Sequence, residues 1–314
     1  MKKRIILGIE TSCDETSLAL IINNKLVDEL TTSSANVQTN FGGVVPEIAT
    51  RYHQNNIHIL LQSILVKNNL TINDLTHIVY TQLPGLPGCL HVGACFAKTL
   101  SNLLNIELLG VNHLYGHLFS PYIDSNNEPK FPILGLIISG GHTTIYLANN
   151  YTDIHILNET RDDAVGEVYD KVARKLGLGY PGGPKIDKLF NLSKNNINFL
   201  KNNLPETEQF SFSGIKTSVL NYINTNKQNN IEIDVIEVAT SFQKTIIDDV
   251  IRKLKYQLKQ YPNINEIAVG GGVAANSYLR NELIKIHPNV LISPLKYTGD
   301  QASMIVYYGS KLIK

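Results

Sequence analysis

The chain lacks tryptophan and has only two methionines and three cysteines in 314 residues. Cys13, Cys89 and Cys95 form an odd set without the paired spacing of a disulfide framework or a cysteine zinc site. Long apolar runs are also absent, because the longest stretches, such as residues 133–138, have the length of a strand and fall far short of the ~20 residues that span a bilayer. We therefore expect a cytoplasmic protein with no membrane segment.

An excess of charge of one sign is missing as well. Lys and Arg total 28 and Asp and Glu total 27, a formal net charge of +1. Without an overall electrostatic field, any contact with RNA must come from a local patch or a companion protein. What the chain does have is 43% hydrophobic residues. That share is enough for a substantial core, and the chain is longer than one ordinary domain, so we expect two lobes.

Two stretches share one pattern of apolar strand, short polar turn and returning strand. The first covers residues 4–22, with a third strand over 26–31, and the second covers residues 131–147. The repetition predicts two related halves. Elsewhere the apolar spacing predicts helices and further strands. The helices are 46–66, 88–104, 232–260 and one from about 276, the strands are 78–80 and 266–269, and a helical insertion with one ordered loop lies within 189–230.

Three turns carry groups suited to phosphate or nucleotide. Residues 8–16 place Glu10 and Asp14 among hydroxyl groups on a hairpin turn, where either carboxylate could face a metal or orient a water. The same residues also fit an ordinary polar turn that faces solvent. Residues 137–143 hold two adjacent glycines, which either allow close backbone approach or serve a tight hairpin. Residues 268–276 give a strand, a glycine loop and a helix start. The spacing matches neither a Rossmann fingerprint nor a P-loop.

His113 and His117 are four residues apart, a spacing that puts both imidazoles on one face of a helix and lets them share a metal. A zinc protease would need a glutamate directly after the first histidine, and this chain has Leu114 there. A third ligand must come from elsewhere, and Asp300 is the candidate. In residues 166–187, Asp170 and Asp187 could accept hydrogen bonds from ribose hydroxyls, while the neighbouring charges also fit ordinary surface ion pairs.

Taken in order, these motifs resemble the tRNA N6-adenosine threonylcarbamoyltransferase family, within the superfamily of actin, sugar kinases and Hsp70. The resemblance implies an α/β, two-lobed actin-like fold with a central cleft, one lobe being 1–130 with 297–314 and the other 131–296. The segments that carry it are 8–16, 42–47, 113–117, 139–143, 170–171, 180–187, 210–216, 270–276 and Asp300.

The resemblance also implies a site. The family's metal ligands match His113, His117 and Asp300, for one divalent ion per chain, with Fe²⁺ as first choice and zinc as the alternative. Its substrate-binding positions match Ile137, Ile138, Ser139, Gly140, Gly141, Asp170, Gly183, Asp187 and Asn276. No catalytic residue is implied. Glu10 and Asp14 are candidates for removing a proton, and Ser139 for supporting an oxyanion.

Members of this family move a threonylcarbamoyl group from threonylcarbamoyl-AMP to N6 of adenosine 37, in the anticodon loop of tRNAs that read codons beginning with A. In bacteria their partners are a paralogous actin-like subunit and a small P-loop ATPase. Basic residues that could contact tRNA are Lys171, Arg174, Lys175, Lys185 and Lys188, followed by Arg252, Lys253 and Lys255. The alternatives are a metal-dependent peptidase, which lacks its glutamate, and a non-catalytic actin-like ATPase or scaffold, which needs no such ligand set.

Four positions depart from the family's pattern. Leu83 stands where glycine is usual, Tyr115 where bacterial members often carry an acidic residue, Gln301 where asparagine follows the metal aspartate, and Ser303 where alanine is common.

Overall fold

The computed structural model describes residues 3–38, 41, 43–125, 127–199 and 209–313. Gly42, part of one family motif, lies outside the described residues. The chain divides into two compact units. Unit 1 comprises residues 1–128 and 293–314, and unit 2 comprises residues 129–292. Among the described residues, no helix combines the length and the apolar character needed to cross a membrane.

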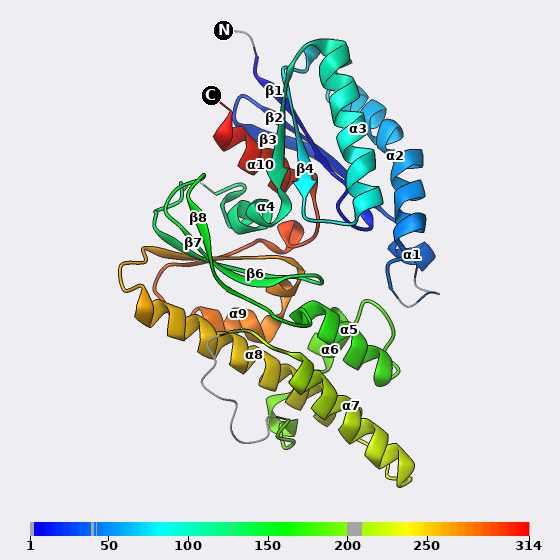
Figure 1. Cartoon of the computed structure of the whole chain (residues 1–314), viewed down its shortest axis with the longest axis vertical. Helices are drawn as coiled ribbons and strands as arrows, with labels where there is room; N and C mark the ends of the chain where they lie inside the picture. Colours follow the sequence, from blue (N-terminus) through cyan, green and yellow to red (C-terminus); the bar gives the residue numbers. More distant parts are fainter. Residues whose placement is uncertain (1–2, 39–40, 42, 126, 200–208, 314) are drawn as a thin grey trace. The chain divides into compact units, whose positions relative to one another are not determined.

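Unit 1 is built on a five-stranded sheet in the order β3-β2-β1-β4-β5 (Figure 1). The first three strands form an antiparallel meander, and β4 and β5 are added in parallel. The strands are β1 Ile5–Glu10, β2 Glu15–Ile22, β3 Lys25–Ser33, β4 His77–Leu83 and β5 Glu107–Asn112. The helices are α1 Ala35–Gln38, α2 Pro46–Lys67, α3 Pro87–Leu104, α4 His113–Phe119 and α10 Ala302–Leu312.

The alternation of side chains along β1 decides which groups face which helix. Leu7 and Ile9 join the apolar cluster that contains Ile57 of α2. Gly8 faces the other way, where an added Cβ would lie 2.5 Å from the Cβ of Val306 in α10. Glu10 shares the face of Gly8, so its carboxylate is directed toward the side of the sheet that α10 covers.

Unit 2 repeats the topology. Its sheet has the order β10-β9-β6-β7-β8, again a three-stranded antiparallel meander extended by two parallel strands. The strands are β6 Ile133–Ile138, β7 Thr143–Ala148, β8 Ile154–Glu159, β9 Glu266–Gly270 and β10 Val290–Ile292. The helices are α5 Val165–Lys175, α6 Gly183–Leu189, α7 Ser213–Gln228, α8 Val235–Gln260 and α9 Ser277–Leu283. The shared strand order confirms the prediction of two related halves.

Most of the strands and helices predicted from the sequence are present within a few residues of their expected bounds. The predicted turn over residues 11–16 is shorter than expected, because β2 already begins at Glu15. Three strands of the structure, β5, β8 and β10, are not predicted from the sequence.

Candidate metal centre and nucleotide site

The two histidines owe their position to the junction of β5 and α4 in unit 1. Asn112 ends the strand, and its side chain accepts a hydrogen bond from the backbone N–H of Leu114, which starts the helix at His113. One helical turn later His117 lies on the same face. Both side chains are buried, and their ring centroids are 4.7 Å apart.

Asp300 meets the two histidines from the segment before α10. Its Oδ1 lies 3.0 Å from His117 Nε2 and 3.5 Å from His113 Nε2. The three side chains can each place one ligand atom within 4.8 Å of the others. Two imidazoles and a carboxylate are a set that binds divalent transition metals. The three residues predicted as metal ligands are therefore brought together by the fold.

Glu10 supports this group from the end of β1. Its Oε2 lies 3.1 Å from His113 Nδ1, and it also accepts hydrogen bonds from Thr81 Oγ1 and, at 2.5 Å, from the backbone N–H of Ser12. A carboxylate on Nδ1 leaves Nε2 directed at Asp300, as in the carboxylate–histidine–metal arrangement. Burial lowers the pKa of His113, but the facing carboxylates outweigh it and raise that pKa to about 10, so a metal that binds this histidine would have to displace its proton.

His117 provides the test of whether a metal fits. Its ring is fully buried, and among the described residues Nδ1 has no hydrogen-bond partner. Burial lowers the pKa of His117, which favours the neutral imidazole that a metal requires. A neutral His117, a histidine oriented by a carboxylate, and a quarter-exposed Asp300 form a donor set that fits one divalent ion.

The turn between β1 and β2 is held by a residue that the sequence reading did not single out. His53 of α2 is buried, with Nδ1 2.8 Å from Thr16 Oγ1 and Nε2 2.9 Å from the carbonyl oxygen of Cys13. Asp14, inside this turn, is buried and accepts a hydrogen bond from Ser33 Oγ at 3.3 Å. Asp14 therefore owes its position to this turn and not to the candidate metal ligands His113 and His117.

In unit 2 the hairpin between β6 and β7 is the counterpart of that turn. Ile137 and Ile138 are fully buried in the core, so neither side chain can meet a ligand. Ser139 closes the turn: its N–H donates to the carbonyl oxygen of His142 at 2.8 Å, and its Oγ accepts from His142 N–H at 3.2 Å. A Cβ added at Gly140 or Gly141 would meet nothing within 4 Å, so these glycines are open to a ligand.

The remaining predicted binding residues lie on helices α5 and α6 and at the start of α9 in unit 2. Asp170 of α5 accepts a hydrogen bond from the N–H of Gly182 at 2.7 Å, and burial raises its pKa. Asp187 of α6 accepts from the N–H and Oγ of Ser277. Gly183, at the start of α6, has open space where a Cβ would be. The binding role of these residues stays a prediction.

Asn276 belongs to the same group and caps α9. Its Oδ1 accepts from the backbone N–H of Leu279 at 2.9 Å, while its Nδ2 donates to Gln243 of α8. Two glycines of the preceding loop differ in the space around them. Gly271 has φ +94°, and an added Cβ would lie 2.5 Å from the carbonyl oxygen of Ile138, whereas Gly272 faces open space. Gly271 is therefore required by the backbone itself, and a side chain there would disturb the backbone whether or not a ligand binds.

Only some of the basic residues predicted to contact tRNA are exposed. Lys171 pairs with Asp163 and Glu167, and Lys185 Nζ donates to the carbonyl oxygen of Leu178. Arg174, Lys175 and Lys188 are exposed. Of the further candidates Arg252, Lys253 and Lys255, Lys253 is excluded as a tRNA contact. It is buried in an ion pair with Asp249, and its Nζ lies over the rings of Phe210 and Phe212.

Three of the four departures from the family pattern are close in sequence to the metal ligands, and none replaces a ligand. Tyr115 packs edge-on against Tyr308 of α10, with ring centroids 5.9 Å apart. Leu83 is half exposed at the end of β4. Gln301 directly precedes α10, and the N–H of Ser303 donates to Glu29 of β3 at 2.7 Å.

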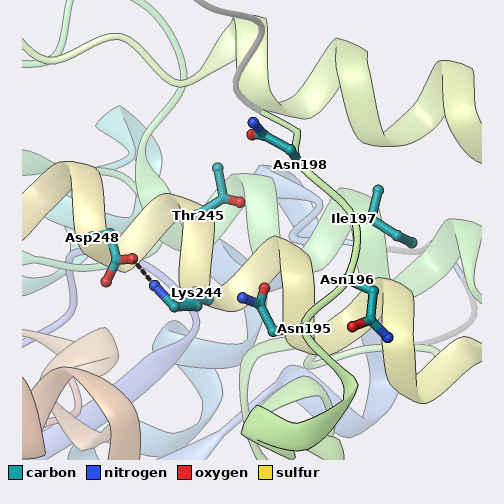
Figure 2. Close-up of a pocket in the computed structure, with 7 residues that line it drawn as sticks. All are labelled: Asn195, Asn196, Ile197, Asn198, Lys244, Thr245 and Asp248. Carbon is teal, nitrogen blue, oxygen red and sulfur yellow. Dashed lines mark hydrogen bonds and ion pairs between the residues drawn. The ribbon is translucent and has the colours of Figure 1, made fainter.

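Two pockets lie among the described residues, and both are lined by other residues than those of the candidate site. One of about 240 Å³ is lined by residues 195–198 together with Lys244, Thr245 and Asp248 of α8. Figure 2 shows Lys244 and Asp248 joined as an ion pair along its edge. A larger one of about 610 Å³ lies beside α7. Neither contains a residue predicted to bind metal or substrate.

Comparison with known proteins gives a consistent result. The family model of tRNA N6-adenosine threonylcarbamoyltransferase matches residues 25–307. An enzyme of that name from Ureaplasma parvum is 51% identical over 310 residues, covering 99% of this chain and 96% of the relative. Another from Mycoplasmoides gallisepticum is 48% identical over 321 residues, covering 100% and 99%.

Two solved structures share the fold. Full-length HypF in its phosphate- and nucleotide-bound form has a TM-score of 0.65 at 13% identity, covering 99% of this chain and 47% of its own. Component A of the Acidaminococcus fermentans (R)-2-hydroxyglutaryl-CoA dehydratase has a TM-score of 0.56 at 12% identity, covering 99% and 100%. At such low identity the likeness shows the fold alone, and it confirms the predicted α/β actin-like class.

Proposed function

We propose that this chain, which belongs to the tRNA N6-adenosine threonylcarbamoyltransferase family, takes its acyl group from threonylcarbamoyl-AMP and transfers it to adenosine 37 of tRNAs that read codons beginning with A. In this reaction N6 of the adenine attacks the carbamoyl carbon. The bond from that carbon to the phosphate oxygen breaks, AMP leaves with the electron pair, and the N6 proton is lost. As its substrate is tRNA, we place the reaction in the cytoplasm.

The observation that supports this proposal best is the convergence of His113, His117 and Asp300 in unit 1. These residues would hold one divalent metal, Fe²⁺ as first choice and zinc as the alternative. When bound, such an ion supplies a Lewis acid for a carbonyl or phosphate oxygen. A scaffold or a non-catalytic ATPase would not need this buried set of ligands.

Glu10 and Asp14 are the carboxylates considered for receiving the N6 proton. Glu10 is occupied by His113, Ser12 and Thr81, so it orients His113 and is a poor choice for receiving the N6 proton. The carboxylate of Asp14 accepts from Ser33 Oγ and has the side chains of Cys13 and Glu15 beside it, but it does not orient a metal ligand, so Asp14 is the better candidate. Ser139 could support an oxyanion through its O–H, since its backbone N–H already donates to the carbonyl oxygen of His142.

The nucleotide part of the donor would use unit 2. Gly140, Gly141 and Gly183 offer open backbone to a phosphate or a base. The carboxylates of Asp170 and Asp187 can accept hydrogen bonds from ribose hydroxyls. An exocyclic amine is a weak nucleophile, so holding donor and acceptor in line is the larger part of the catalysis.

The decisive experiment is in vitro modification of an unmodified tRNA with purified threonylcarbamoyl-AMP. We expect formation of the modified adenosine when the paralogous actin-like subunit and the small P-loop ATPase are added, and release of one AMP per transfer. His117→Ala is the negative control. Absence of product with donor, tRNA and both partners present would contradict the proposal.

Metal content is tested separately by elemental analysis of the purified chain. Wild type should carry one iron or zinc ion, and the double variant His113→Ala, His117→Ala should carry none. An unchanged metal content in the double variant would show that these residues are not the ligands.

A further inference from the structure

A glutamine that no sequence motif singled out lies at the centre of the hydrogen bonds beneath the proposed nucleotide-binding residues. The side chain of Gln243, in α8, is fully buried. Its Nε2 donates to Asp187 Oδ1 at 2.8 Å, and its Oε1 accepts from Asn276 Nδ2 at 2.9 Å and from the hydroxyl of Tyr169 at 3.3 Å. One amide thereby connects α5, α6, α8 and the cap of α9.

The direction of each bond follows from the charge of Asp187. An ionised carboxylate can only accept, so it must face the NH₂ group of Gln243, and the oxygen of that amide then faces Asn276. Asn276 in turn presents its NH₂ group to Gln243 and its Oδ1 to the N–H of Leu279 at the start of α9. A flip of either amide would put two donors or two acceptors face to face.

Most of the network is also protected from water, while Asp187 is only partly buried. Tyr169 is 1% exposed and Asn276 is 7% exposed. Burial raises the pKa of Tyr169 well above its ordinary value, so the hydroxyl keeps its proton and can donate to Gln243. Buried polar groups of this kind are costly to leave without partners, which makes a fully paired network rigid.

We propose that Gln243 is a positioning residue that fixes the carboxylate of Asp187 and the amide of Asn276 in the orientation needed to bind the adenine nucleotide. This inference rests on the proposed function, because it assumes that Asp187 and Asn276 meet the nucleotide. Gln243 itself lies beneath these two residues and is not assigned a contact with the substrate.

An amide satisfies all three partners at every pH, because it donates to Asp187 and accepts from Asn276 and Tyr169. In Gln243→Glu the donor to Asp187 is replaced by an oxygen, and two carboxylates face each other at high pH. Protonation of the new carboxyl group restores an O–H that can donate to Asp187, so the defect should shrink as the pH falls. In Gln243→Met every hydrogen bond of the side chain is lost, and no pH restores them.

The matched control is Gln257→Glu, because Gln257 is another buried glutamine of the same helix. The titratable side chains in contact with Gln243 are Tyr169 and Asp187. On α8 itself, the nearest charged groups, Lys244 and Asp248, pair with each other. Wild type and Gln257→Glu, measured at each pH, correct for any titration of these groups.

The test is calorimetric titration of the full chain with AMP, at about pH 8 and about pH 5.5, on either side of the pKa expected for the new carboxyl group. Thermal melting of each variant is measured alongside. We expect wild type and the control to bind alike, and Gln243→Glu to bind on the order of tenfold more weakly at the higher pH. Gln243→Glu should recover most of this loss at the lower pH, and Gln243→Met should stay weak at both.

Other results would contradict either the positioning role of Gln243 or the proposed function. If wild type binds AMP and the folded Gln243→Glu variant binds equally well at the higher pH, the positioning role is wrong while the proposed function stands. A loss in Gln243→Glu that does not recover at the lower pH also contradicts it. If Gln243→Glu fails to fold, unaltered affinity in Gln243→Met overturns the inference. Wild type that binds neither AMP nor threonylcarbamoyl-AMP overturns the proposed function and the inference together.

Discussion

Replacing Glu29 should loosen the start of α10 and, with it, the metal ligand Asp300. The carboxylate of Glu29 in β3 accepts from the N–H of Ser303 at 2.7 Å, and Ser17 Oγ in β2 accepts from the N–H of Ala302 at 3.0 Å. The residue before α10 contributes no side-chain cap of its own. Two strands therefore cap this helix, and Asp300 lies just before the capped turn.

The magnitude follows from these contacts. Loss of an N-cap costs about 0.5–2 kcal/mol, and loss of a negative charge beside a helix N-terminus costs about 0.3–1 kcal/mol more. We expect Glu29→Ala to lower the free energy of unfolding by about 1–3 kcal/mol. Partners that orient a ligand directly typically contribute 10–100-fold to metal affinity, and Glu29 acts on Asp300 through the capped turn, so metal binding should weaken by about tenfold.

Urea unfolding and titration of the metal-free chain with Fe²⁺ or Zn²⁺ measure the two effects. Glu47→Ala is the control, because Glu47 pairs with Arg51 on α2 and the side chains of the pair are 75% and 73% exposed. Such a pair contributes about 0–1 kcal/mol. If Glu29→Ala matches the control in both stability and metal affinity, then the capping of α10 does not position Asp300.

Further predictions concern unit 2. Gly272→Val should leave folding intact and abolish AMP binding in calorimetry, whereas Gly271→Val should lower the melting temperature, since its Cβ would meet the backbone at a φ of +94°. Asp163→Asn should cost about 1–3 kcal/mol in urea unfolding at neutral pH. Burial raises the pKa of Asp163, but two lysines outweigh it and hold that pKa well below its usual range, so the stabilisation is complete above the unfolded pKa of about 4 and is lost as the pH falls below it. The double variant Arg174→Ala, Lys175→Ala should flatten the salt dependence of tRNA binding, and an unchanged slope would move the tRNA contact elsewhere.

The strands missed from the sequence share a physical reason. β8 lies at the edge of its sheet and exposes Ile156, so its apolar residues do not mark a buried face. β10 has three residues, too few for any periodicity. β5 is only partly buried and contains Gly110. Pattern recognition depends on a buried face of sufficient length, and these strands have none.

Local patterns of residues are enough to predict most of the secondary structure and the composition of the candidate metal centre. Periodic apolar residues specified the meanders and the long helices, and the spacing of His113 and His117 placed two imidazoles on one face. Both depend on neighbours within a few turns of chain, which a single sequence displays directly. The matching order of the motifs was sufficient to indicate the family.

Tertiary structure alone decided which distant groups meet. Asp300 reaches His117 across 183 residues of sequence, because α10 returns to the sheet that carries β5 and α4. Gln243 lies in a helix whose pattern indicated only burial, and its three partners come from other segments. Side chains far apart in sequence are brought together by packing and by the need to pair every buried polar group, and neither condition is written in the local pattern of residues.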